Sequence, residues 1–191
     1  MARHRFPDTR DRIQRAAIEL FVEKGVDATT VRDVARAVGI SEGALYRHFT
    51  SKEALVWELF ERHYVPFAGR LEARAAAEPT ARGRLAAMIR GFCHAHDEDP
   101  LLFRFLLFVQ HGQLGRLAPG SPTPVDAVRA VIAQGIASKE IPRQDPDLAT
   151  ALVFGIVLQP VTFAAYGRLP SSLTLQCDRL VAASWAAVTT V

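Results

Sequence analysis

The sequence predicts an all-α protein in which an N-terminal domain of three short helices, residues 1–52, precedes a larger helical domain, residues 53–191. Apolar residues recur three and four positions apart along most of the chain, which is the period of an amphipathic helix. The sequence shows no convincing alternation of the kind expected of a strand. The 191 residues, 49% of them hydrophobic and 23% charged, are enough to bury an apolar core in one or two domains.

The helices of the N-terminal domain are predicted from an apolar stripe and from residues that start and stop helices. The stripe begins at Ile13 and continues through Ala17 and Phe21 towards Gly25, which ends the first helix. The expected N-caps of the first four helices are Asp8, Thr30 in a capping box with Asp33, Ser41, and Thr50 in a box with Glu53. The fourth helix is expected to run to about residue 77, out of the small domain.

Longer and more apolar helices are predicted beyond Pro79. We expect them at about residues 80–97, 100–111, 123–138, 146–167 and 172–189. Six of the 13 residues from Gly112 to Pro124 are Gly or Pro, which predicts a mobile loop between the second and third of these helices.

The second and third helices of the small domain have the features of two helices that cross steeply. Such a crossing needs a small residue where the backbones approach and a glycine where the chain turns through positive φ. Ala35 and Gly39 supply these features, and Leu45 falls where the third helix must pack back on the second. This is the helix-turn-helix arrangement, in which the second helix of the pair enters the major groove of DNA.

Two kinds of DNA contact are expected from this unit. Side chains near the start of the inserted helix would reach base edges: Ser41, Glu42, Gly43, Ala44 and Arg47. Glu42 would accept from cytosine, and Arg47 would donate to guanine. Phosphate contacts are expected from Thr30, Tyr46, His48 and Lys52.

A structural interpretation of the same residues stays open. Taken singly, Thr30 and Ser41 are caps, Tyr46 and Phe49 are core residues, and Lys52 is a solvated residue of a first helical turn. The segment Arg3-His4-Arg5 would either reach an adjacent minor groove or form a disordered terminus.

The distribution of charge also favours an anionic partner for the N-terminal domain. The net charge is only +3, but residues 1–52 carry 10 basic and 7 acidic side chains, whereas the remaining residues carry 13 of each. Cys93 and Cys177 are too few for a disulfide framework and form no CxxC pair. Because no apolar region of a secretory signal follows the first 12 residues, we expect a cytoplasmic location.

Four runs within residues 13–59 carry a family resemblance: Thr29-Thr30-Val31-Arg32-Asp33-Val34-Ala35, Gly39-Ile40-Ser41, Leu45-Tyr46-Arg47-His48-Phe49 and Ser51-Lys52-Glu53-Ala54-Leu55. Together they resemble the N-terminal domain of TetR-family transcriptional regulators. The resemblance implies a homodimer, an inverted-repeat operator, and a ligand cavity in the C-terminal domain whose occupation releases DNA. It also implies the phosphate and groove contacts named above. Val26 departs from the pattern, in which an aromatic residue is common.

The last two helices, near residues 146–167 and 172–189, are expected to form the homodimer interface. Leu148 to Gly167 is a run of 20 residues without a charge, and the last helix combines several alanines with Trp185. Two copies of each helix would bury these surfaces in a four-helix interface. The alternatives are an ordinary intramolecular core and, for the uncharged run, a membrane span, which Gln159 and the absence of an aromatic belt disfavour.

A small, mostly apolar effector is expected because residues 100–111 are rich in phenylalanine and poor in charge. The candidate ligand-binding residues are Trp57, Tyr64, Phe92, Phe103, Phe105 and Phe108, with His96 and His111 as polar groups. Aromatic residues at helical spacing are more often core, so a filled core remains the alternative.

Enzyme activity and a metal site are not expected, and no cofactor is implied. The segment Cys93-His94-Ala95-His96-Asp97-Glu98-Asp99 contains suitable groups, but neighbours in a helix point about 100° apart, which leaves His94 with Asp97 or Glu98 as the sensible pair. The sequence therefore predicts a ligand-responsive transcriptional regulator, most simply a repressor, in which the fourth helix transmits the effect of the ligand.

Overall fold

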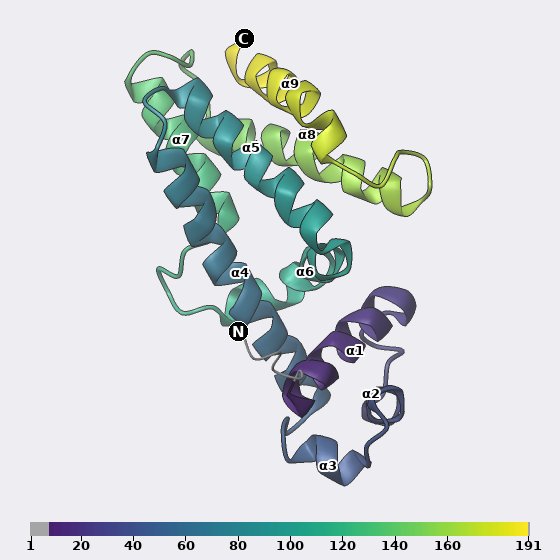
Figure 1. Cartoon of the computed structure of the whole chain (residues 1–191). Helices are drawn as coiled ribbons and strands as arrows, with labels where there is room; N and C mark the ends of the chain where they lie inside the picture. Colours follow the sequence, from purple (N-terminus) through teal and green to yellow (C-terminus); the bar gives the residue numbers. More distant parts are fainter. Residues whose placement is uncertain (1–7, 191) are drawn as a thin grey trace, which may run out of the picture. The chain divides into compact units, whose positions relative to one another are not determined.

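The computed structural model describes residues 8–190, which form nine α-helices and two short 3-10 turns (Figure 1). The helices are α1 (Thr9–Lys24), α2 (Val31–Val38), α3 (Glu42–Tyr46), α4 (Lys52–Ala76), α5 (Ala81–Glu98), α6 (Pro100–Gln113), α7 (Pro124–Ala137), α8 (Pro146–Ala165) and α9 (Cys177–Thr189). The 3-10 turns are η1 (Leu114–Arg116) and η2 (Thr174–Gln176). The predicted all-α fold is confirmed. The segment Arg3-His4-Arg5, for which the sequence predicts either a minor-groove contact or a disordered terminus, lies outside the described residues.

The chain packs as two units. The first contains residues 8–63 and 101–117, and the second contains residues 64–100 and 118–190. The helix α4 begins in the first unit and ends in the second, and it is continuous across Pro66. The packing thus groups the start of α4 and most of α6 with α1 to α3, while the functional boundary after residue 52 stays a prediction.

The first unit is built on the predicted apolar stripe of α1. Ile13, Ala17 and Phe21 are buried, and the ring of Phe21 stacks on that of Phe105 of α6 with centroids 5.9 Å apart. The helices α1, α2 and α3 pack in sequence order, and Leu45 of α3 is almost completely buried. The buried faces of these short helices explain why they are stable at lengths that would be marginal in isolation.

The predicted caps are correct at two helices and incomplete or wrong at two others. Ser41 accepts from the Ala44 N–H at the start of α3, as expected, and the box at α2 is described below. Asp8 precedes α1, but its side chain makes no capping hydrogen bond. At α4 the cap is Ser51 and not Thr50, because the Ser51 hydroxyl accepts from the Ala54 N–H at 3.0 Å.

The second unit consists of the end of α4 with α5, α7, α8 and α9. The helix α5 packs on α7 and α9, and α8 packs on α7 and α9. Gly135 of α7 permits a close approach, because a Cβ there would lie 2.7 Å from Ile141 Cδ1. The predicted long loop is shorter than expected: α6 and η1 extend to Arg116, which leaves residues 117–123 between them and α7. The last helix begins at Cys177 after η2, later than predicted.

Candidate nucleic-acid interface

The helix-turn-helix unit is formed by α2, α3 and the turn between them. Thr30 and Asp33 form a complete capping box at the start of α2, as predicted. The pKa of Asp33 is lowered mainly by the hydrogen bond from the Thr30 hydroxyl and next by that from the Thr30 N–H, so the carboxylate form holds the box. The capping box therefore fixes the residue at which α2 begins.

Gly39 ends α2 in the left-handed conformation, with φ 75° and ψ 36°. The Gly39 N–H donates to the Arg36 carbonyl, and the Ile40 N–H donates to the Ala35 carbonyl at 3.0 Å. This turn uses the last carbonyls of α2 and redirects the chain into α3, as the sequence predicts.

The helix α3 buries one face and exposes the other. Leu45 and, beyond the helix, Phe49 are buried, whereas Gly43 and Arg47 are exposed. Tyr46 is 50% exposed, so the structural interpretation of this residue as core is wrong, while that of Phe49 is correct. The exposed face leaves the candidate base-contacting side chains accessible.

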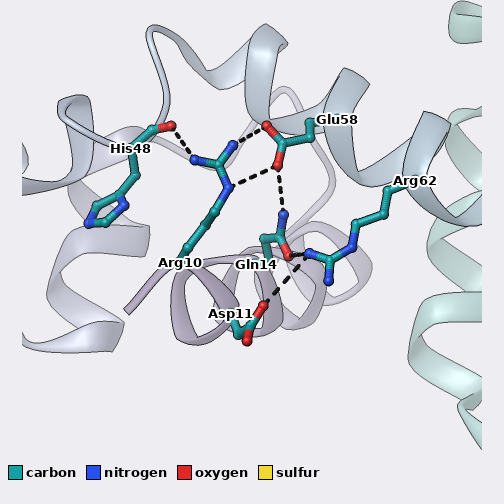
Figure 2. Close-up of polar contacts among 6 residues, drawn as sticks. All are labelled: Arg10, Asp11, Gln14, His48, Glu58 and Arg62. Carbon is teal, nitrogen blue, oxygen red and sulfur yellow. Dashed lines mark hydrogen bonds and ion pairs between the residues drawn. The ribbon is translucent and has the colours of Figure 1, made fainter. Parts of the chain in front are cut away.

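A polar cluster connects α1 with the start of α4 and with the end of the helix-turn-helix (Figure 2). Arg10 donates to both carboxylate oxygens of Glu58 and, through Nη1, to the His48 carbonyl at 3.0 Å. Glu58 also accepts from Gln14, whose own oxygen accepts from Arg62 at 2.6 Å. Because His48 lies two residues beyond the last residue of α3, this cluster holds the end of α3 against α1 and α4.

Two further cations hold backbone carbonyls around the same unit. The Arg12 guanidinium donates to the Val38 carbonyl at 2.7 Å, at the end of α2. The Lys52 ammonium donates to the Val26 carbonyl at 2.8 Å, in the loop between α1 and α2. An ammonium has three N–H donors, so these contacts give Lys52 a structural role beside its predicted phosphate contact. Neither the long-range role of Arg12 nor that of Arg10 was predicted from the sequence.

An ion pair on the exposed face was also missed by the sequence reasoning. Arg32 Nε donates to Glu42 Oε1 at 2.8 Å, and the side chains are 72% and 43% exposed. The hydrogen bond that Arg32 donates to Glu42, followed by the negative charge of that carboxylate, raises the pKa of Arg32. The two residues are ten positions apart in different helices, so helical spacing alone gives no signal for their pairing.

The predicted ligand-binding residues are divided between the two units. Trp57, Phe103, Phe105, Phe108 and His111 belong to the first unit, and Tyr64, Phe92 and His96 belong to the second. In the first unit Phe103 and Phe105 are buried, whereas Phe108 and His111 are exposed. The Arg116 guanidinium lies 4.5 Å from the centroid of the Trp57 ring. These contacts describe packing and leave the predicted binding role untested.

The second unit contains a narrow apolar gap and an open groove. Phe92 makes edge-on contacts with Phe67 and Phe154, and with Val128 and Val153 it borders the gap, which has no room for a water molecule. The groove is separate, has a volume of about 440 Å³, and lies between the end of α4 and helices α5 and α7. Its walls are formed by Glu72, Ala75, Ala76, Arg84, Met88, Ala127, Ala130, Val131 and Gln134.

The polar segment at the end of α5 has a structural arrangement. Asp97 pairs with a different histidine from the expected His94, because Asp97 Oδ1 lies 2.9 Å from Nδ1 of the adjacent, buried His96. Asp97 also accepts from the Ser172 hydroxyl and from the N–H groups of Leu173 and Thr174. Desolvation raises the pKa of Asp97, but these hydrogen bonds together outweigh it and hold the pKa well below the usual range.

Nothing in this segment resembles a reactive centre. Burial, with a smaller contribution from a hydrogen bond to Cys177, raises the pKa of the Cys93 thiol far above its usual range, which disfavours the nucleophilic thiolate. Between residues 8 and 190, no group of three or more His, Cys, Asp or Glu side chains is placed to hold a metal ion.

The surface of α8 is unusually apolar. Among the described residues α8 is the one helix long and apolar enough to cross a membrane by length and composition alone, with a mean hydropathy of 1.9. Only 28% of the residues in that stretch are buried. Leu148, Leu152 and Phe163 are exposed, so much of this apolar face has no partner within the described chain.

Comparisons with known proteins agree with these features. Residues 13–59 match the family model described as bacterial regulatory proteins, tetR family. The transcriptional repressor KstR2 of Rhodococcus jostii (strain RHA1) is 40% identical over 81 residues, which are 42% of this chain and 40% of that protein. The fatty acid metabolism regulator protein of Bacillus subtilis (strain 168) is 26% identical over 77% of this chain and 78% of its own length.

Two solved structures share the fold of the whole chain. FadR from Bacillus subtilis, solved in complex with stearoyl-CoA, has a TM-score of 0.72 at 21% identity and covers 94% of this chain and 98% of its own. PfmR from Thermus thermophilus has a TM-score of 0.71 at 24% identity and covers 97% of this chain and 98% of its own.

A helix-turn-helix followed by a larger all-helical unit defines the class of helix-turn-helix regulatory proteins. Residues 13–59 thus form a helix-turn-helix domain of the tetR family of bacterial regulatory proteins, and the whole chain shares the fold of the solved FadR structure. This is a family of transcriptional regulators and not of enzymes, which confirms the resemblance and the expected class of protein.

Proposed function

We propose that the chain is a homodimeric transcriptional repressor that binds an inverted-repeat operator and is released by a small, mostly apolar molecule. The observation that carries the proposal is the helix-turn-helix itself: a capped α2, a left-handed Gly39 and an α3 that buries Leu45 while exposing its other face. In such a unit the second helix enters the major groove and its exposed side chains contact bases.

The proposed DNA contacts follow from exposure and chemistry. Groove contacts are assigned to Ser41, Glu42, Gly43, Ala44 and Arg47, all in or beside α3. Phosphate contacts are assigned to Thr30, Tyr46, His48 and Lys52. The hydroxyl of half-exposed Tyr46 is suited to a phosphate oxygen, and Lys52 retains one N–H donor beyond those directed at Val26 and Asp27.

The proposed homodimer interface uses the exposed faces of α8 and α9. Leu148, Leu152 and Phe163 lie on one face of α8, and Leu148 is 61% exposed. Alanines at exposed positions of α9, among them Ala182 and Ala186, would permit close helix packing. Four helices from two copies would bury an apolar surface that is otherwise costly to expose.

The proposed effector is apolar because the groove of the second unit is largely apolar. This groove, between α4, α5 and α7, has Met88, Val131 and several alanines in its wall. The FadR structure contains stearoyl-CoA, and the Bacillus subtilis relative is named as a regulator of fatty acid metabolism, which makes long acyl chains the first ligands to test. Binding that favours a conformation with the wrong separation of the two α3 helices would weaken operator binding. A cytoplasmic location accompanies this function.

The proposal is tested by selecting bound duplexes from a random DNA pool at physiological salt, with the mass of the protein measured by light scattering. We expect a dimer and an inverted repeat whose half-sites are one helical turn, or a multiple of it, apart. A selection that enriches no sequence contradicts the proposal. The selected duplex then serves to compare stearoyl-CoA with free coenzyme A as a control, and release by the acylated molecule alone is the expected result.

Substitutions separate the two proposed kinds of contact. Arg47→Ala should relax the base preference at one position of each half-site, whereas Lys52→Ala should weaken binding to all duplexes and reduce the salt slope by about one unit. Lys52→Ala also removes the hydrogen bond to the Val26 carbonyl, so its melting temperature is measured alongside. Identical effects of the two substitutions on base preference would contradict this division.

A further inference from the structure

The two cysteines of the chain meet in the second unit, although they stand far apart in the sequence. Cys93 lies in α5, and Cys177 is the first residue of α9. A hydrogen bond joins the two thiols, and both side chains are buried, with Cys93 0% and Cys177 6% exposed. Because the chain has only two cysteines, every thiol of the protein belongs to this one pair.

Two polar contacts hold α5 against η2 and the start of α9, one on each side of the cysteine pair. Arg90, three residues before the cysteine of α5, donates through Nη2 to Asp178 Oδ1 at 2.7 Å. Asp97, four residues after that cysteine, accepts through Oδ2 from the Thr174 N–H at 2.9 Å. Positions three and four apart share one face of a helix, and the partners follow in reverse order along the second segment. The register of the two segments therefore places the cysteines opposite each other, between the two contacts.

Two adjacent thiols can be oxidised to a disulfide, and a peroxide is a sufficient oxidant. One cysteine, as the thiolate, attacks an oxygen of hydrogen peroxide and becomes a sulfenic acid, with release of water. The second thiol then attacks the sulfenic sulfur, so that the S–S bond forms and the sulfenic oxygen leaves as water. Two thiols and one peroxide thus give one disulfide and two water molecules. Each sulfur loses one electron, and each peroxide oxygen gains one.

Burial makes this reaction slow and its product durable. The pKa of the Cys93 thiol is raised, mainly by desolvation, so little thiolate is available at neutral pH and the pair is not a fast reactive centre. Disulfides are easily reduced where they are exposed or where the reduced form is stabilised as a thiolate. Neither condition holds at this buried pair, so it responds to prolonged oxidation and keeps the bond once formed.

We propose that Cys93 and Cys177 form a modification site at which prolonged exposure to a peroxide produces an intramolecular disulfide between α5 and α9. A reducing cytoplasm keeps thiols reduced, so the bond forms only when an oxidant accumulates. The inference is independent of DNA binding. It concerns the helix α9, which the proposed homodimer interface uses, because the bond ties the first residue of that helix to α5.

The test treats the reduced full chain with hydrogen peroxide and follows the products by mass spectrometry of the intact protein and of its peptides, without reductant. Free thiols are titrated in urea. Melting curves are recorded before oxidation, after oxidation and after reduction with dithiothreitol. Cys93→Ala and Cys177→Ala are the matched controls, because each keeps one thiol and cannot form the bond within one chain.

We expect the wild type to lose two hydrogens and both titratable thiols, with Cys93 and Cys177 joined within a single chain. Because the disulfide closes a long loop, oxidation should raise the melting temperature by about 4–16 °C, and dithiothreitol should reverse the rise. Neither single variant should show this reversible rise, whatever its own melting temperature before oxidation.

Three results would overturn the inference. In the first, both thiols still titrate after a treatment that fully oxidises the same chain unfolded in urea. In the second, the peroxide produces sulfenic or sulfinic acid, or links two chains, without joining the pair. In the third, the disulfide forms but lowers the melting temperature, which shows that the bond requires the native packing of α9 on α5 to be broken. The duplex selection tests the proposed function separately, and its result does not depend on any of these outcomes.

Discussion

Replacement of Gly39 tests whether the turn of the helix-turn-helix depends on backbone conformation alone. Gly39 has φ 75°, and a Cβ built there meets no heavy atom within 4 Å. Steric crowding by neighbours therefore contributes nothing, and the cost of Gly39→Ala is that of holding an L-residue in the left-handed region, about 1–2 kcal/mol. Gly39→Val should cost more because a β-branched residue is a genuine outlier there, whereas Gly39→Asn should cost less.

The assay is urea and thermal unfolding followed by far-ultraviolet circular dichroism. For a chain of this length each kcal/mol corresponds to about 2–4 °C, so Gly39→Ala should lower the melting temperature by about 2–8 °C. Gly43→Ala is the control: Gly43 lies in α3 without positive φ, and a Cβ there also meets nothing within 4 Å. It should gain about 0.5–1 kcal/mol from helix propensity. Equal stability of Gly39→Ala and wild type would refute the reasoning.

Three further predictions concern the cap, the dimer and the Asp97 site. Thr30→Ala removes the capping box of α2 and should cost about 1 kcal/mol by urea unfolding, and an unchanged midpoint would contradict the assigned cap. Leu152→Arg should convert the dimer into a monomer by light scattering, whereas Val125→Glu, at an exposed apolar position of α7, should leave the mass unchanged; a dimeric Leu152→Arg would exclude this face of α8. Asp97→Asn should destabilise the protein at pH 7. Because the folded-state pKa of Asp97 is lowered, its stabilisation is present above the ordinary carboxyl pKa of about 4 and is lost as the pH falls below it, so the two melting curves should converge in acid. A stability difference independent of pH would show that the charge of Asp97 is not involved.

The sequence alone determined those structural features that depend on residues no more than three or four positions apart in the chain. The capping box of Thr30 with Asp33, the cap at Ser41 and the left-handed Gly39 are each formed between near neighbours, so residue type and spacing suffice. The helices follow for a similar reason, since an apolar stripe at helical spacing must be buried on one side. The wrong cap at α4 marks the limit of such prediction: Thr50 and Ser51 are adjacent hydroxyl residues that share the chemistry of a cap, and in the structure Ser51 makes the capping hydrogen bond.

Contacts between segments distant in the chain required the tertiary structure. The hydrogen bonds of Arg10 join residues 38 and 48 positions apart, and Arg32 meets Glu42 only because the turn at Gly39 places α3 beside α2. Lys52 likewise reaches the carbonyl of Val26, 26 positions away. A charged side chain can reach several partners, and packing alone decides which of them is near.

The aromatic residues show the same division most plainly. Phe105 and Phe108 stand three positions apart in one helix and have the same chemistry, yet Phe105 is buried against Phe21 and Phe108 is exposed. The sequence determined that the chain is helical and that its N-terminal domain is a helix-turn-helix, because both follow from local spacing. Which apolar side chains fill the core, line a groove or remain on the surface was decided only by tertiary packing, because burial depends on neighbours that local spacing does not specify.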